Sequence, residues 1–143
     1  MHRLILLLGL LVVSACSAVP LEPEGPLVVV STRGGDCPEG MCTSTTVIER
    51  DGRVHRTEPE AAEIGRISGD EVGLLSAAVR STDFVLLRSK PFTGECPVNF
   101  DGQELIYEFS APSGVERIAS CEVEIDPAHP LFAAVDAALA SGP

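Results

Sequence analysis

The sequence lacks any hydrophobic run long enough to cross a membrane as a stable helix. Its longest apolar stretch, Leu4–Val13, has ten residues, whereas a transmembrane helix needs about 20. The stretch follows a short basic start at His2 and Arg3 and ends at the small residues and cysteine of Val13–Cys16. This arrangement is typical of a cleaved leader rather than of a retained anchor.

Basic residues are also scarce. The 143 residues include 10 lysines and arginines against 21 aspartates and glutamates, which gives a formal net charge of −11 at pH 7. Such an excess of negative charge repels phosphate backbones and anionic lipid headgroups, so we expect no nucleic-acid partner. The chain left after removal of the leader is long enough for one domain with a modest core.

No recognised catalytic motif is present. The sequence has no GxSxG elbow, HExxH helix, glycine-rich phosphate loop or dinucleotide fingerprint. Beyond the leader the only histidines are His55 and His129, which we interpret as a surface residue and a helix-start residue. The carboxylate pair Glu122 and Glu124 is explained by alternation on a solvated strand. The sequence therefore predicts a protein that is not an enzyme and has no cofactor.

The cysteines indicate disulfides rather than a metal site. Apart from Cys16, four cysteines remain, an even number that in an exported chain argues for two disulfides. Three pairings are open. We favour Cys37 with Cys42, which closes a small loop, and Cys96 with Cys121, which ties the two ends of a hairpin. A zinc site is the alternative, but the spacing is not that of two CxxC knuckles, so no metal is predicted.

A calcium site is a second metal hypothesis. Asn99, Asp101 and Glu104 offer oxygen ligands within a few residues of one another. They lack the regularly spaced Asp and Asn pattern of a known calcium loop. We therefore do not assign them to a metal.

The first half of the chain after the leader predicts three antiparallel strands and a helix. Leu27–Thr32, Thr43–Arg50 and Arg53–Thr57 are the strands, and Asp51 and Gly52 suit the tight turn between the last two. Glu58–Ile67 is predicted to be a polar connection. Ser68 and Glu71 have the capping-box spacing, so a helix should begin there and pack the stripe of Val72, Leu75 and Val79 on the sheet.

The second half predicts a hairpin and another helix. Phe84–Leu87 is a strand or a buried connection, and Pro91–Asp101 is irregular. Glu104–Phe109 and Val115–Ile125 are strands. The last helix opens at Asp126 and Pro127 or at His129 and Pro130, with Leu131, Val135 and Ala138 as its buried stripe.

These elements predict an α+β fold. Two hairpin-plus-helix halves contribute to one antiparallel sheet, on which two helices pack. A weak internal echo supports the halves, because Gly35–Pro38 recurs as Gly94–Pro97 with Glu95 in place of Asp36.

Val13–Cys16 resembles the lipobox of bacterial lipoprotein signals. The resemblance implies cleavage before Cys16, diacylglycerol on the Cys16 thiol and a lipid anchor on the extracytoplasmic face of the membrane of the cell envelope. Residues 1–15 are then the leader, residues 16–26 the lipidated cysteine with a proline-rich tether, and residues 27–143 the folded domain. An ordinary secretory signal, in which Cys16 is incidental and the product soluble, is the alternative.

Two further resemblances concern the whole domain. The layout of Gly34–Pro38, Pro91–Pro97, Phe100–Gly102, Tyr107–Phe109 and Pro130–Ala134 resembles small uncharacterised lipoproteins of actinobacteria, which implies no activity. The helix, Cys96–Asp101, hairpin and Cys121 are similar to the subtilisin-inhibitor family of streptomycetes. That similarity implies that Val98 fills a protease's primary pocket. The chain departs from the family in having valine there, a narrower first cysteine pair and a C-terminal helix.

The two Cys-Pro loops favour binding over chemistry, because proline and cystine leave little entropy to lose on docking. The candidate binding loop consists of Pro97, Val98, Asn99, Phe100 and Asp101. We expect a lipid-anchored, non-catalytic binding or envelope-accessory module whose partners are the membrane, through Cys16, and an envelope or secreted protein. A serine protease inhibitor and an envelope enzyme are the alternatives.

Overall fold

The computed structural model describes residues 24–37 and 42–142. The predictions for the leader, for lipidation at Cys16 and for most of the tether lie outside these residues, as does the tip of the Cys37–Cys42 loop.

Six strands form one sheet in which every neighbouring pair is antiparallel, with strand order β4-β3-β2-β1-β5-β6. The strands are β1 (Val28–Gly34), β2 (Ser44–Ile48), β3 (Arg53–Glu58), β4 (Ala62–Arg66), β5 (Gln103–Ala111) and β6 (Gly114–Ala119). The pairing of β1 with β5 joins segments from the two halves of the chain. The α+β antiparallel fold predicted from the sequence is confirmed.

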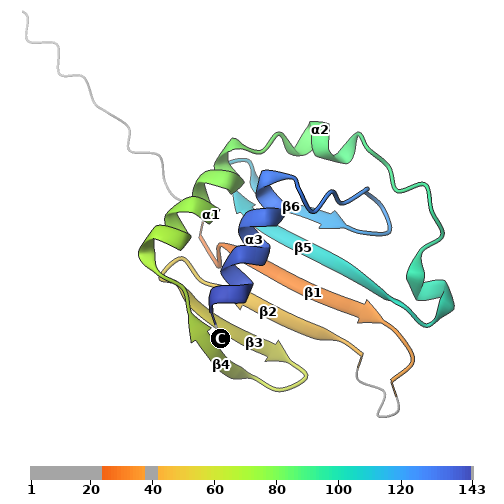
Figure 1. The fold of residues 1–143 in the computed structure, drawn as a ribbon, viewed down its shortest axis with the longest axis horizontal. Coiled ribbons are helices and arrows are strands. Elements are labelled where there is room, and N and C mark those ends of the chain that lie inside the picture. Colours follow the sequence, from red (N-terminus) through yellow and green to blue (C-terminus); the bar gives the residue numbers. More distant parts are fainter. Residues whose placement is uncertain (1–23, 38–41, 143) are drawn as a thin grey trace, which may run out of the picture.

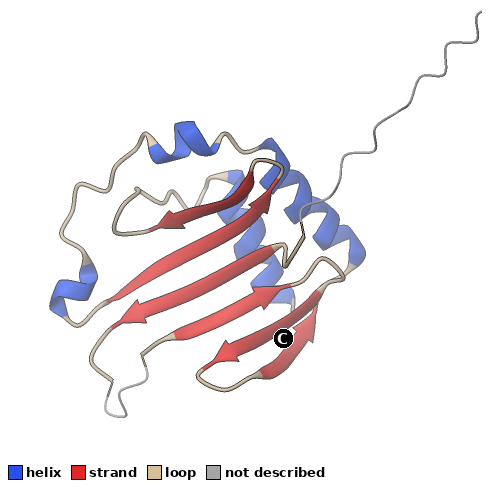
Figure 2. Ribbon diagram, turned by 180° about the vertical axis from the view of Figure 1, so that it is seen from behind, coloured by secondary structure: helices blue, strands red, loops and turns tan. Residues whose placement is uncertain are grey.

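Two helices cover one face of this sheet (Figure 1). They are α1 (Gly69–Ser81) and α3 (Pro130–Ser141); a short helix α2 (Phe84–Arg88) and a 3-10 helix η1 (Pro97–Phe100) lie along the connection from α1 to β5. Seen from behind, the other face of the sheet carries no described helix (Figure 2). The sheet therefore has one covered and one open face.

The core lies between the sheet and the two long helices. Tyr107 and Phe109 of β5 point into it and stack with ring centroids 5.9 Å apart, and Phe132 of α3 lies 5.2 Å from Tyr107. Leu75 and Val79 of α1 are fully buried against the same cluster. The strand predicted over Glu104–Phe109 and the buried stripes of both helices are confirmed.

The helix starts follow from local hydrogen bonds. The backbone amide of Glu71 donates to Ser68 Oγ at 3.2 Å, and the amide of Ser68 donates to Glu71 Oε2 at 2.7 Å, which completes the predicted capping box. For α3 the structure selects the second of the two predicted starts. His129 is the N-cap, its Nδ1 accepting from the amide of Leu131 at 3.2 Å, and Pro130 follows at the first helical position.

The Asp51 and Gly52 turn is confirmed between β2 and β3. Gly52 has a φ of 85°, and a β-carbon there would lie 2.7 Å from the carbonyl oxygen of Ile67. Both the backbone angle and the close approach require glycine.

The prediction of a polar connection over Glu58–Ile67 is wrong in part; for Phe84–Leu87 the strand alternative is wrong, whereas the burial of Phe84 and Leu87 agrees with the predicted buried connection. Part of Glu58–Ile67 forms the edge strand β4, which lacks a clear polar and apolar alternation because an edge strand buries little. Phe84–Leu87 forms a helix rather than a strand, because Asp83 caps it by accepting from the amide of Leu86 at 2.9 Å. Phe84 and Leu87 are its buried residues, one helical turn apart.

The strand predicted over Val115–Ile125 is too long. It ends at Ala119, whose carbonyl accepts from the amides of both Glu122 and Val123 at 2.9 Å in a tight turn. The prediction that Glu122 and Glu124 alternate on a solvated strand is therefore wrong. Cys121 lies in the turn.

The buried phenol of Tyr107 gives a prediction for alkaline pH. Desolvation, aided by the carboxylate of Asp136, raises the pKa of Tyr107 above its ordinary value of about 10. Because the pKa of Tyr107 is raised in the folded state, the stability contributed by its neutral phenol is fully present below pH 10. This contribution falls as the pH rises beyond 10. Tyr107 is the only tyrosine and tryptophan is absent. Tyrosinate absorbance should therefore titrate above pH 10 in the folded protein and near 10 in denaturant; coincident curves would contradict this.

Candidate functional site

Both disulfides lie at one end of the sheet. Cys37 pairs with Cys42 between β1 and β2, and Cys96 pairs with Cys121 between the η1 segment and the turn after β6, with Cα atoms 5.5 and 5.1 Å apart. The pairing predicted from the sequence is confirmed. We call this end, formed by the C-terminal ends of β1, β3 and β6 and the N-terminal ends of β2, β4 and β5, the disulfide end. The two disulfides indicate an oxidising compartment outside the cytoplasm.

The candidate binding loop is a compact turn at this end. Pro97–Phe100 forms η1; the amide of Asn99 donates to the carbonyl of Cys96 at 3.0 Å, and that of Gly102 to the carbonyl of Pro97 at 2.8 Å. Asp101 follows in the left-handed conformation with a φ of 59°. The loop therefore holds its shape through its own backbone.

The loop packs closely on its neighbours. A β-carbon at Gly34 would lie 2.9 Å from Cγ2 of Val98, and one at Gly102 would lie 2.6 Å from Cβ of Pro97. Val98 is 37% exposed over Gly34, whereas Phe100 is 63% exposed. The outermost apolar group of the loop is thus Phe100 rather than Val98.

This geometry bears on the resemblance to protease inhibitors. The bond between Val98 and Asn99 lies inside a helical turn, and the Val98 side chain rests on β1. Peptide segments that dock along a partner by main-chain pairing do so in an extended conformation. Presentation of Val98 to a protease would require η1 to unwind.

The two Cys-Pro loops, treated separately in the sequence, meet in the structure. Gln103 Nε2 donates to the carbonyl of Cys42 at 2.9 Å. A β-carbon at Gly35, beside Cys37, would lie 3.3 Å from Sγ of Cys42 and 3.5 Å from the carbonyl oxygen of Asp101. Segments about 60 residues apart in the chain therefore form one continuous surface.

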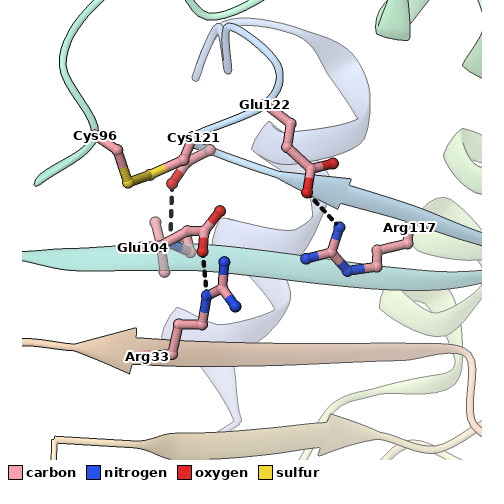
Figure 3. Close-up of polar contacts among 8 residues, drawn as sticks. Arg33, Cys96, Glu104, Arg117, Cys121 and Glu122 are labelled. Carbon is pink, nitrogen blue, oxygen red and sulfur yellow. Dashed lines mark hydrogen bonds and ion pairs between the residues drawn. A yellow bond between two sulfur atoms is a disulfide. The ribbon is translucent and has the colours of Figure 1, made fainter. Parts of the chain in front are cut away.

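An ion pair between a buried carboxylate and an exposed arginine lies beside this surface on the open face of the sheet (Figure 3). Glu104 of β5 is directly opposite Arg33 of β1, and Arg33 Nε donates to Glu104 Oε2. The Glu104 side chain is fully buried, whereas that of Arg33 is 59% exposed. The other carboxylate oxygen, Oε1, is enclosed and accepts no hydrogen bond from any described residue. Sequence reasoning missed this pair.

The calcium hypothesis fits this geometry poorly. Glu104 is buried and paired with Arg33, while Asn99 and Asp101 are exposed in the loop. Among residues 24–37 and 42–142, no three His, Cys, Asp or Glu side chains gather as metal ligands would.

The two histidines lie apart from this end. His55, on β3, has Nε2 3.8 Å from Glu49 Oε1. His129 lines a pocket of about 300 Å³ with Lys90, Glu124 and Asp126, but its Nδ1 caps α3. None of the described residues that line this pocket carries a hydroxyl or thiol.

We compared the chain with protein-family models, curated proteins and solved structures. Nothing matched in any of the three. In the part of the chain that the structure describes, no helix has both the length and the apolar character needed to span a bilayer.

Proposed function

We propose that this chain is a lipoprotein whose domain is a non-catalytic binding or envelope-accessory module, held outside the membrane by a lipid on Cys16. The pattern of Val13–Cys16 supports the lipid, and the disulfides support the compartment. The disulfide end is the proposed binding surface.

One observation carries the choice of surface: the chain joins the sheet at the end opposite the disulfides. Ser110 Oγ donates to the carbonyl of Pro26, and the amide of Leu27 donates to the carbonyl of Ile48 at 2.9 Å. We call this opposite end of the sheet the tether end. The seven residues of β1 separate the two ends by about 20 Å. A lipid at Cys16 then attaches the tether end and leaves the disulfide end directed away from the attachment (Figure 1).

The presence of the lipid on Cys16 can be tested by the mass of the protein. Intact mass spectrometry of the membrane-extracted protein should show a chain that begins at Cys16 and carries acyl groups. Cys16→Ser should release the domain from the membrane fraction, because without acyl chains nothing in the proposal holds it there. A non-acylated native chain found in the soluble fraction would refute the anchor.

The binding surface is tested by site-specific photocrosslinking in the native envelope. A photoreactive residue in place of Phe100 should form a discrete adduct. The matched control is Val115, which is 69% exposed against 63% for Phe100 but lies at the tether end. Equal adducts from both positions, or none from position 100, would show that the disulfide end is not the binding surface.

A further inference from the structure

Charge is distributed unequally between the two ends of the sheet. Five exposed carboxylates lie at the disulfide end: Asp36, Glu58, Glu60, Glu95 and Asp101. Within the described residues none of them takes part in an ion pair. Of the arginines there, Arg33 is engaged by Glu104, and Arg56 donates to the carbonyl of Glu60 at 3.3 Å. The disulfide end therefore presents uncompensated negative charge.

At the tether end several charged groups are engaged with one another or with backbone carbonyls. Arg53 pairs with Asp51 at 2.8 Å, and Arg66 donates to the carbonyl of Asp51 at 2.7 Å. Arg50 donates to the carbonyls of Gly25 and Ser110. Ion pairing thus offsets more of the negative charge at the tether end than at the disulfide end.

An apolar group lies within this acidic surface. Phe100 is 63% exposed, and it follows the partly exposed Val98 on a loop stiffened by the Cys96–Cys121 disulfide. Rigid aromatic residues ringed by polar groups are frequent anchors of protein interfaces. Phe100 favours a partner with an apolar side chain over a simple cation.

Glu104 adds an independent sign of a missing donor. Its enclosed Oε1 accepts nothing from the described residues, and an unsatisfied carboxylate oxygen costs free energy. Among the described residues, only the exposed Arg33 side chain pairs with this carboxylate. A guanidinium or ammonium group of a partner would supply the kind of donor that Oε1 lacks.

From these observations we infer that the disulfide end binds a basic polypeptide segment that places a large apolar side chain on Phe100 and its cations among the carboxylates. The inference rests on the proposed function and adds the chemistry of the partner. Charge complementarity of this kind raises the association rate and selects against acidic partners.

The test uses three labelled synthetic peptides and the mature protein in detergent. In the first peptide arginine alternates with leucine; the second replaces leucine with serine, and the third replaces arginine with glutamate. Fluorescence anisotropy should show salt-sensitive binding of the first, about tenfold weaker binding of the second and none of the third.

Variants at the disulfide end should reproduce these losses. Phe100→Ser should weaken binding of the first peptide about tenfold. Asp36→Asn combined with Asp101→Asn should weaken it about fivefold at low salt, and asparagine tolerates the left-handed backbone of Asp101. The charge-matched control combines Glu108→Gln and Asp136→Asn, exposed positions on β5 and α3, and should bind as the parent does. Thermal melts verify that each variant is folded.

The outcomes separate the two proposals. Equal loss in the control variant, or equal binding of the leucine and serine peptides, would mean non-specific attraction to an acidic protein and would overturn the inference. Full displacement of the first peptide by spermine at equal charge would do the same. If the peptides fail while position 100 still crosslinks in the envelope, the partner chemistry is wrong and the proposed function stands. If position 100 does not crosslink either, both fall.

Discussion

Replacing Cys96 and Cys121 with serine is expected to lower the free energy of unfolding by about 3–4 kcal/mol. The pair is separated by 25 residues along the chain, and without the bond the unfolded chain regains the entropy of that loop. A domain of this size has only about 5–15 kcal/mol of net stability, so the change is large. Urea denaturation of the soluble domain, followed by far-ultraviolet circular dichroism, measures it.

The matched control is the double serine variant of Cys37 and Cys42. Their separation is only five residues, so the same reasoning gives a loss of about 2 kcal/mol. The two losses should therefore rank by loop length. A larger loss for the Cys37 and Cys42 variant would show that its contribution comes from contacts at the disulfide end rather than from chain entropy.

The parts of the fold that the sequence predicted are those with strong local signals. Ser68 and Glu71 specify a helix start within four residues, and Asp51 and Gly52 specify a turn within two. The α2 helix was missed because Phe84–Leu87, taken as an apolar run, is as compatible with a strand as with a helix. The decisive local signal was Asp83, which caps the helix. Strand β4 was missed because it sits at an edge and buries little.

In the candidate site, too, local sequence predicts some features, whereas others depend on how distant strands pair. The cysteine pairs and the Pro97–Asp101 loop could be predicted because their spacing is visible in the chain. The meeting of the two loops could not, since it depends on β1 pairing with β5. The Arg33 and Glu104 pair depends on that register as well, and a shift of one residue would turn Glu104 to the other face of the sheet. Non-local register thus decides which carboxylate is buried.

Arg33→Met is expected to destabilise the domain by about 2–3 kcal/mol, although it replaces an exposed side chain. Removing Arg33 leaves the enclosed carboxylate of Glu104 without its partner, and breaking a buried ion pair usually costs about 3–5 kcal/mol. Because Arg33 is 59% exposed, water can replace part of the charge stabilisation that Arg33 gives Glu104. We therefore expect a loss of about 2–3 kcal/mol, below the usual range for a buried pair. Chemical denaturation measures the loss.

The reciprocal change should behave differently. Glu104→Met removes the buried charge and leaves only an exposed arginine, which water solvates, so we expect a change within about 1 kcal/mol of the parent. The double variant should recover most of the stability that Arg33→Met loses, because no carboxylate is then left buried.

Arg117→Met is the control, since it breaks an exposed ion pair with Glu122 on the same face and should cost below about 1 kcal/mol. Equal losses for Arg33→Met and Arg117→Met would show that Glu104 does not depend on Arg33, and the unfilled acceptor at the disulfide end would lose its significance for binding.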